Sequence, residues 1–524
     1  MRHSPFLPAL LVSLLVHTAC GDKPSPSPDA GTQVEDAGTT PPDAGTSETD
    51  GGTTSPLCGT GSALTRAAAP VNQALIEDPT ADILDRLRAI PGLTVQENPN
   101  GSPVPNGHRF FVMEYDQPAD HSRPECQRFK QRITLLHTSD TAPMVLYASG
   151  YYVSTRVSRS ELTLFLGANQ LSIEHRFFPP SRPEPADWSL LTVKQSAADF
   201  HRIVQAFKPI YSARWLSTGA SKGGETVVFF RRFYPQDVDA TVAYVAPLAH
   251  RDDARFPAFQ DTLGGPALAE CRERIHTFQR TVLERREEMV QLWREFAQIN
   301  KLTYEQLGFE KALEHAVIDT YFAFWQYDKP ENCDQFPGPE ATIDELLTTL
   351  SQQVGLSSLA DTGIGSLSYY APYFYQAAVE LGWPQSHEAF LGDLIHFPGT
   401  NNSLVHAPPG VPLAPFRDEA MQDIQDWVST QGERLMFIYG EFDPWTAAAY
   451  SLGGARDSYL YMVPGGNHSS NISRLPDEQY SEAFSTVLRW AGVTGMKRAP
   501  IRVEPRFEEF APHLPPRLRP RDVR

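Results

Sequence analysis

The sequence of 524 residues is poor in cysteine and in positive charge, and each shortage excludes a class of protein. Its five cysteines include no Cys-x-x-Cys pair, and no His-Glu-x-x-His motif occurs, so we expect no metal and no cofactor. Lys and Arg number 45 against 63 Asp and Glu, which gives a formal net charge of -18. Because phosphates are bound by basic faces, this balance argues against nucleic acid as a partner.

The N-terminal apolar run is too short to span a bilayer. It covers residues 6–16, follows a positively charged start and suits the core of a secretory signal. Small residues then lead into Cys20, which resembles a bacterial lipoprotein processing site, although His17 stands where leucine is usual. We therefore expect residues 1–20 to direct export, with Cys20 either lipidated or part of an ordinary secretory signal. The protein would be a cell-envelope lipoprotein or secreted, and would contact a membrane only through that anchor.

Two further segments lack the composition of a folded domain. Residues 21–56 are almost wholly Asp, Ala, Gly, Thr, Ser and Pro, with seven acidic side chains against one lysine. They cannot bury apolar surface, so we expect a disordered acidic linker. Residues 496–524 are rich in basic residues and proline, and we interpret them as a solvated tail with no assigned role.

Apart from Cys20, four cysteines remain, namely Cys58, Cys126, Cys271 and Cys333. An even number suits two disulfides in an oxidising compartment, which agrees with export. Three pairings are possible. We favour Cys271 with Cys333, which lie in one helical segment, and Cys58 with Cys126, which lie in the N-terminal part. Four buried free thiols are the alternative.

Short β-branched and aromatic runs bounded by turn residues predict eight strands. They cover residues 109–115, 132–138, 143–149, 170–173, 214–218, 240–246, 434–439 and 458–463. The later strands alternate with helical stretches at 191–207 and 223–234, which predicts a mostly parallel sheet covered on both faces. The pattern fits an α/β-hydrolase fold, with an eight-stranded, mostly parallel sheet built from residues 57–246 and 427–495.

Residues 247–426 interrupt this alternation with amphipathic helical stretches. We expect them to form a helical cap inserted after the sixth strand. Such an insertion lies over the carboxyl ends of the strands, where ligands bind in open α/β folds. Its aromatic residues, in 321–325 and 369–375, are expected mainly to pack between cap helices, with a substrate pocket as the alternative.

One motif carries the chemistry. Gly219-Ala220-Ser221-Lys222-Gly223 matches Gly-x-Ser-x-Gly, the sharp strand-to-helix turn that raises a nucleophilic serine above a sheet. Its glycines are needed because a side chain at either place would clash in so tight a turn. The predicted strand 214–218 runs into the motif and the apolar stretch 225–233 follows it, which is the context that the motif requires. We therefore predict that Ser221 is a nucleophile.

A nucleophilic serine needs a histidine to take its proton and an acid to orient that histidine. In this fold the chain order is serine, acid, histidine, and only His468 and His513 lie beyond the seventh predicted strand. His513 belongs to the proline-rich tail, whereas His468 follows the eighth strand. Asp443 follows the seventh strand and precedes a proline, with Glu441 as the competing acid. We predict a triad of Ser221, Asp443 and His468.

An oxyanion hole needs two hydrogen-bond donors. We expect one to be the backbone N–H of Lys222 and the other to come from the loop after the third predicted strand, at Tyr151. In the same loop, Gly150 permits close approach of the backbone and Tyr152 is a candidate for substrate contact. Simple packing under the cap is the alternative for both tyrosines.

Several segments together resemble the secreted bacterial tripeptidyl aminopeptidases, which are serine peptidases of the α/β-hydrolase fold. The segments are Gly150-Tyr151-Tyr152, Gly167-Ala168-Asn169-Gln170-Leu171, Glu174-His175-Arg176-Phe177-Phe178, Asp187-Trp188, Gly219-Ala220-Ser221-Lys222-Gly223-Gly224 and Tyr244-Val245-Ala246-Pro247. The resemblance covers roughly residues 60 to 490, and it extends distantly to prolyl carboxypeptidase and dipeptidyl peptidase II. It implies release of short peptides, chiefly tripeptides, from free N-termini. The lipoprotein-like cysteine and the acidic linker depart from a freely secreted enzyme.

An exopeptidase of that kind must recognise the terminal ammonium of its peptide substrate, which calls for a partly buried carboxylate near the acyl site. We expect Glu174 to supply it, because Glu174 ends the fourth predicted strand on the side where the serine is displayed. A scaffolding role, paired with His175 or Arg176, is an equal alternative. Glu225 is less suited, because it should already lie within the helix after the nucleophile.

Three functions compete on this sequence. The leading one is an exported serine exopeptidase that acts through an acyl-enzyme on peptides with a free N-terminus. A carboxylic esterase on the same scaffold is the second, and activity on amide bonds discriminates between the two. The third is a non-catalytic, surface-displayed binding protein, which would not react with an organophosphonate.

Overall fold

The computed structural model describes residues 72–494 and Arg502. The predicted signal segment, the linker and all of the tail except Arg502 lie outside the described residues. The same is true of Cys20, Cys58 and His513.

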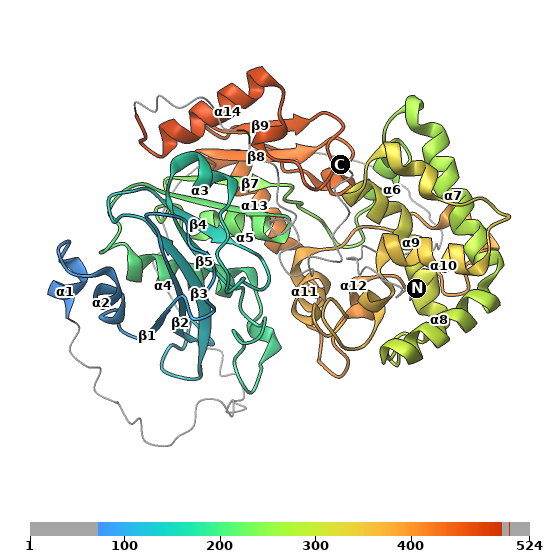
Figure 1. Ribbon diagram of the computed structural model, residues 1–524, viewed down its shortest axis with the longest axis horizontal. Helices are drawn as coiled ribbons and strands as arrows, with labels where there is room; N and C mark the ends of the chain where they lie inside the picture. Colours follow the sequence, from blue (N-terminus) through green and yellow to red (C-terminus); the bar gives the residue numbers. More distant parts are fainter. Residues whose placement is uncertain (1–71, 495–501, 503–524) are drawn as a thin grey trace, which may run out of the picture.

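Nine strands of the described chain form one sheet (Figure 1). They are β1 (Leu93–Glu97), β2 (Arg109–Pro118), β3 (Arg128–His137), β4 (Met144–Ala148), β5 (Asn169–Ile173), β6 (Trp215–Ala220), β7 (Ala240–Tyr244), β8 (Leu435–Gly440) and β9 (Tyr459–Val463). Their order is β1-β2-β3-β5-β4-β6-β7-β8-β9. The pairs from β1 to β5 are antiparallel, and the pairs from β5 to β9 are parallel.

The predicted α/β-hydrolase fold is confirmed, with nine strands instead of eight. The additional strand is β1, at the antiparallel edge of the sheet. Four of its five residues are exposed or only partly buried, so the strand shows little apolar signal in the sequence.

Helices cover both faces of the sheet. Those of the sheet domain are α1 (Gln73–Glu77), α2 (Ile83–Arg88), α3 (Glu161–Leu166), α4 (Val193–Phe207), α5 (Lys222–Phe233), α13 (Asp418–Gln431) and α14 (Asp477–Trp490), with the short turns η1 (Trp188–Leu190), η7 (Pro444–Ala448) and η8 (Ile472–Arg474). Val145 and Val242 pack with α3 and α14, whereas the next residues, Leu146 and Ala243, pack with α4 and α5. This alternation follows from the two-residue period of a strand.

The segment between β7 and α13 is helical and adds no strand to the sheet. It contains α6 (Arg255–Gln260), η2 (Pro266–Leu268), α7 (Ala269–Glu284), α8 (Arg286–Asn300), α9 (Phe309–Tyr327), η3 (Pro330–Gln335), α10 (Ile343–Val354), η4 (Leu356–Leu359), α11 (Ala371–Gln376), η5 (Ala377–Leu381), η6 (Ala389–Leu394) and α12 (Ser403–His406). Figure 1 shows α7 to α10 gathered on one side of the molecule, beside the sheet domain. The expected end of the cap at residue 426 falls inside α13, which packs against α5 and so lies with the sheet helices.

Cap and sheet domain meet at the carboxyl ends of the parallel strands. The backbone N–H of His468, after β9, donates to the carbonyl of Gln326 in α9 at 3.0 Å. On the other side, the ring of Tyr151, after β4, packs edge-on against Tyr370 and Tyr373 of the α11 region. The cap therefore encloses the edge of the sheet at which ligands bind in this class of fold.

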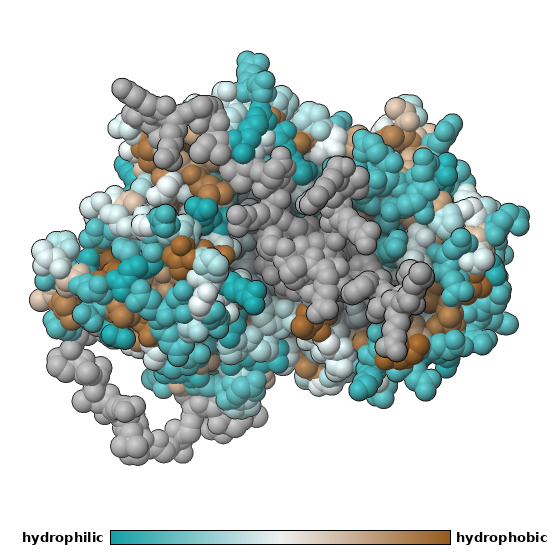
Figure 2. All heavy atoms as spheres, in the orientation of Figure 1, coloured by the Kyte–Doolittle hydropathy of each residue, from teal (hydrophilic) through white to brown (hydrophobic). Residues whose placement is uncertain are grey.

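The structure also gives the surface character of one face and the state of three cysteines. No helix in residues 72–494 is long and apolar enough to cross a membrane. On the face shown in Figure 2, hydrophobic residues are scattered among hydrophilic ones. Cys271 of α7 and Cys333 of η3 form a disulfide, with their Cα atoms 5.5 Å apart. Cys126 is also disulfide-bonded, and its predicted partner Cys58 lies outside the described residues.

We expect the double substitution Cys271→Ser and Cys333→Ser to lower the free energy of unfolding by about 2 to 4 kcal/mol. The bond closes a loop across 62 positions, and its loss frees the unfolded chain. Thermal unfolding followed by circular dichroism measures the effect. Glu273→Ser, an exposed change on the same helix, is the control and should change the melting temperature little. A double variant with the same melting temperature as the wild type would contradict the prediction.

Candidate active site

Ser221 occupies a strained turn between β6 and α5. Its φ of 54° and ψ of -128° lie in a region that residues with a side chain rarely adopt. Two backbone hydrogen bonds hold it there. Its N–H donates to the carbonyl of Tyr244 at 2.9 Å, and its carbonyl accepts from the N–H of Glu225 at 3.0 Å. The turn is the nucleophile elbow that the sequence predicts.

Three glycines make this turn possible. A Cβ at Gly219 would collide with the carbonyl of Gly223, and a Cβ at Gly223 would collide with the carbonyl of Ala148 at the end of β4. Gly150, with a φ of 75°, lies against the same place, since its Cβ would be 2.5 Å from the N of Gly223. The loop after β4 is thereby packed directly against the elbow.

Asp443 and His468 form a buried pair. Oδ2 of Asp443 lies 2.7 Å from Nδ1 of His468, and both side chains are at most 1% exposed. The other carboxylate oxygen of Asp443 accepts from the backbone N–H of Trp445 at 3.1 Å. The competing acid, Glu441, is exposed and accepts from the N–H of Gly465 instead. The histidine is thus oriented by Asp443, in the arrangement that fixes one tautomer of an imidazole.

The three predicted triad residues lie at one edge of the sheet. Ser221 follows β6, Asp443 follows β8 and His468 follows β9, and these strands are parallel within one continuous run. Nε2 of His468, the nitrogen opposite Asp443, is buried and has no hydrogen-bond partner among the described residues. It is therefore available to a nucleophile or a substrate, and such contacts often tighten only when a ligand binds.

The predicted oxyanion donors differ in their hydrogen bonds. The N–H of Lys222 begins α5, where the first N–H groups of a helix have no partner within that helix. The N–H of Tyr151 already donates to Oγ of Ser149 at 3.1 Å. In the part of the chain that the structure describes, neither Lys222 nor Tyr152 has an acceptor for its N–H.

Glu174 is fully buried and its carboxylate is occupied. Oε2 accepts from the N–H of Val153 at 2.9 Å and lies 3.5 Å from the Arg132 guanidinium, while Oε1 accepts from Oγ of Ser181 at 2.8 Å. Burial nevertheless raises the pKa of Glu174 to about 7. These contacts favour the scaffolding alternative over recognition of an ammonium group, with Arg132 and not His175 or Arg176 as the charged partner.

Two buried residues of opposite charge on α5, Lys222 and Glu225, were not predicted from the sequence as a pair. Lys222 is buried, and its Nζ lies 5.7 Å from the ring centre of Tyr151 and 5.9 Å from that of Phe178, with no hydrogen-bond partner among the described residues. Glu225 is buried one turn later on α5. Burial lowers the pKa of Lys222 to about 7 and raises that of Glu225 to about 8, and each charge opposes the other's shift. The sequence contained one signal for this pair, because side chains of opposite charge three residues apart lie on the same face of a helix.

Aromatic residues from the cap close over this region. Tyr369 of the cap stacks on Tyr152 of the loop after β4, with their ring centres 4.4 Å apart. Phe178 packs edge-on against Tyr151 and Tyr152. Tyr369, Tyr370 and Tyr373 of the cap therefore pack against the loop that lies beside the elbow.

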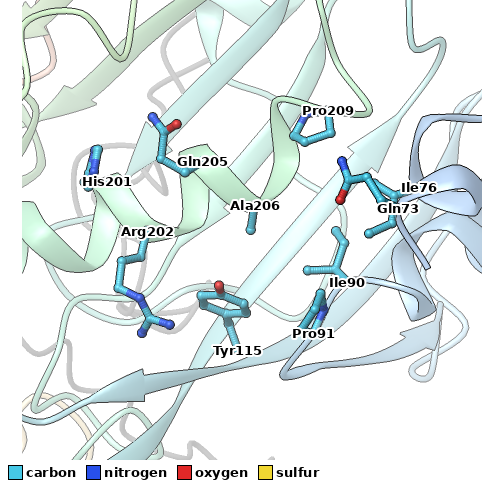
Figure 3. A pocket seen from close by; sticks show the side chains of 10 residues that line it. All are labelled: Gln73, Ile76, Ile90, Pro91, Tyr115, His201, Arg202, Gln205, Ala206 and Pro209. Atoms are coloured by element: carbon cyan, nitrogen blue, oxygen red, sulfur yellow. The ribbon is translucent and has the colours of Figure 1, made fainter. Parts of the chain in front are cut away.

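A separate pocket of about 430 Å³ lies between α1, β2 and α4 (Figure 3). Its lining includes Tyr115, His201 and Arg202, and none of the predicted site residues takes part. In residues 72–494 no group of three His, Cys, Asp or Glu side chains is placed to hold a metal ion.

An elbow serine at the edge of this sheet, together with a buried acid–histidine pair, defines a serine hydrolase of the α/β-hydrolase fold. The family described as PS-10 peptidase S37 matches residues 76–523. The chain belongs to this family and is a serine peptidase.

The chain is also similar to individual known proteins. The chain is 41% identical over 438 residues to the prolyl tri/tetrapeptidyl aminopeptidase of Streptomyces mobaraensis, which covers 82% of this chain and 89% of that protein. Among solved structures, the peroxisomal alpha-beta-hydrolase Lpx1 of Saccharomyces cerevisiae is 12% identical, with a TM-score of 0.33, over 76% of this chain and 93% of that one. Carboxyl esterase 2 of Tuber melanosporum is 12% identical, with a TM-score of 0.32, over 75% and 88%.

We expect Glu225→Gln to flatten the dependence of stability on pH. The raised pKa of Glu225 means that its stabilising contribution is complete below its ordinary value of 4.5 and is lost as pH rises toward about 8. The melting temperature of the wild type should therefore fall over that interval, by several degrees more than that of the variant. Scanning fluorimetry in a pH series measures this. Glu478→Gln, an exposed change on α14, should keep the wild-type slope, and an unaltered slope for Glu225→Gln would refute the prediction.

Proposed function

We propose that this protein is an exported aminopeptidase that releases tripeptides or other short peptides from free N-termini through an acyl-enzyme. The observation that carries the proposal is the pairing of Asp443 with His468, 2.7 Å apart and buried, at the sheet edge that displays Ser221. The extensive similarity to a prolyl tri/tetrapeptidyl aminopeptidase supports the choice of substrate, including proline before the cleaved bond.

In the proposed mechanism, Oγ of Ser221 attacks the scissile carbonyl carbon while Nε2 of His468 takes the hydroxyl proton. Asp443 accepts the hydrogen bond from Nδ1–H and stabilises the imidazolium. The N–H of Lys222 donates to the developing oxyanion, with a second donor from the loop 150–152. Collapse of the intermediate breaks the C–N bond, and His468 gives its proton to the leaving amine. Water, deprotonated by His468, then hydrolyses the ester on Ser221.

The cap supports action on chain ends. It contacts the loops after β4 and β9, so it covers the nucleophile from two sides. A long polypeptide would have to pass beneath it, whereas a terminus can enter alone. Flat rings at Tyr151, Tyr152 and Phe178 suit the compact apolar ring of a prolyl residue.

Export is part of the proposal. The disulfides at Cys126 and between Cys271 and Cys333 suit an oxidising compartment. We propose that Cys20 carries the lipid of a cell-envelope lipoprotein. The mass of the mature N-terminal peptide tests this, because an unmodified peptide would leave a simply secreted enzyme.

A tripeptide anilide that ends in proline is expected to be cleaved when its amine is free, and at least about 100-fold more slowly when the amine is acetylated. Ser221→Ala should lower kcat by a factor of at least about 10⁴, because the attacking oxygen is lost. Ser217→Ala, in β6, is the matched control and should retain activity. Equal cleavage of both substrates would indicate an endopeptidase, and turnover of esters alone would indicate an esterase.

A further inference from the structure

Asp319 is a buried carboxylate with almost no partner. It lies on α9, which is buried on every side from Ala312 to Gln326, and it is 1% exposed. Its Oδ2 has no hydrogen-bond partner among the described residues, and its Oδ1 has a single long contact, 3.5 Å from Nδ2 of Asn401. Burial raises the pKa of Asp319 well above its ordinary value, and no cation among the described residues opposes that rise. Native proteins rarely leave such a group unpaired unless it has another role.

A second unpaired acceptor lies beside it. Nδ2 of Asn401 faces two acceptors, Oδ1 of Asp319 and the carbonyl of His315, and these contacts fix the orientation of the amide. Oδ1 of Asn401 is then left buried without a partner among the described residues. Two buried acceptors with no donor between them suit a ligand group that only donates. A primary ammonium, with three N–H bonds and a positive charge, is such a group.

The same face of α9 leads from Asp319 to the active site. Residues three and seven positions further along share its face, and these are Phe322 and Gln326. Phe322 packs edge-on against Trp445 of η7, two residues after Asp443. The carbonyl of Gln326 accepts the N–H of His468. Asp319 is thus connected to the acid–histidine pair through one continuous helix face.

Further polar atoms near this face are buried without a partner in the described chain. They are Oε1 of Gln326 and Nε1 of Trp445. They mix donors and acceptors, as the backbone of an extended peptide would require. A peptide that lies along α9 would satisfy them together, whereas a purely structural carboxylic acid at Asp319 would explain none of them.

The spacing matches a tripeptide. Seven residues of helix separate Asp319 from Gln326, which is about 10 Å at 1.5 Å per residue. Three residues of extended peptide also span about 10 Å. We propose that Asp319, with Asn401, binds the N-terminal ammonium of the peptide substrate and that α9 sets the length of the peptide released. The proposal rests on the aminopeptidase activity proposed above.

Two rival carboxylates near the active site already have partners. The carboxylate of Glu174 accepts hydrogen bonds from Val153 and Ser181 and pairs with Arg132. Glu380 of η5 accepts from the N–H of Val193 at 2.8 Å and pairs with Arg417 at 2.7 Å. A third, Glu225, accepts no side-chain hydrogen bond among the described residues, but the nearby charge of Lys222 opposes the rise in its pKa, and no such cation acts on Asp319 within the described chain. None of them leaves two donor-seeking oxygens buried together, as Asp319 and Asn401 do.

The test compares two anilides in the full-length protein. One is the tripeptide with a free amine, and the other is its des-amino analogue, in which hydrogen replaces the amine. Asp319→Asn should lower kcat/KM for the free-amine substrate by about 100-fold and leave the des-amino analogue unchanged. Asn401→Ala, which keeps the charge, should give a loss of about 10-fold of the same kind. It also tests the proposal if Asp319→Asn does not fold.

Glu314→Gln is the matched control, because Glu314 is a buried carboxylate on the same helix whose partners include Arg286 and the N–H groups of His396 and Phe397. The Glu314→Gln variant should have the same ratio of kcat/KM between the free-amine and des-amino anilides as the wild type. A folded Asp319→Asn protein that keeps the wild-type preference overturns this inference alone. A wild type that cleaves both anilides equally overturns the proposed aminopeptidase function itself.

Discussion

Backbone crowding beneath Ser221 is the constraint on which the rest of the site depends. The strand β6, the loop after β4 and the start of α5 approach so closely that side chains are excluded at Gly150, Gly219 and Gly223. This packing holds Ser221 in a strained conformation, at a cost of the order of 1–3 kcal/mol that the surrounding sheet offsets. In return, the serine and the first N–H of α5 have fixed positions before any substrate arrives, which is what preorganised stabilisation of an oxyanion requires.

The cap is a second determinant of the site, because it covers the edge of the sheet at the carboxyl ends of the strands and buries the polar groups there. Burial under it brings Lys222 and Glu225 toward their neutral forms, because neither charge is fully solvated or hydrogen-bonded. The same burial strengthens the bond between Asp443 and His468. It also makes each unpaired polar atom costly, so the polar atoms along α9 that lack a partner in the described chain support the proposed peptide site.

The sequence predicted those parts of the molecule that depend on local chain conformation. The elbow at Ser221 could be read because strand, glycines and helix are consecutive. The central strands could be read because their apolar runs are continuous. The edge strand β1 could not, because its side chains are mostly exposed and its pairing with β2 supplies the missing stabilisation. Glu174 ends its strand at the expected edge, but its carboxylate contacts Arg132, Val153 and Ser181. The sequence around Glu174 contains no pattern that predicts these contacts.

By itself, then, the sequence determined the class of fold, the order of its elements, the nucleophile turn and the pair of residues that could follow it as acid and histidine. Those features depend on residues that are close together in the sequence. Only the tertiary structure showed that Asp443, which the sequence favoured over Glu441, contacts His468, that Glu174 is enclosed, and that Oδ2 of Asp319 has no partner among the described residues. These outcomes depend on which distant segments supply donors and exclude water. The free energy of a buried polar group is set by such contacts and not by its place in the chain.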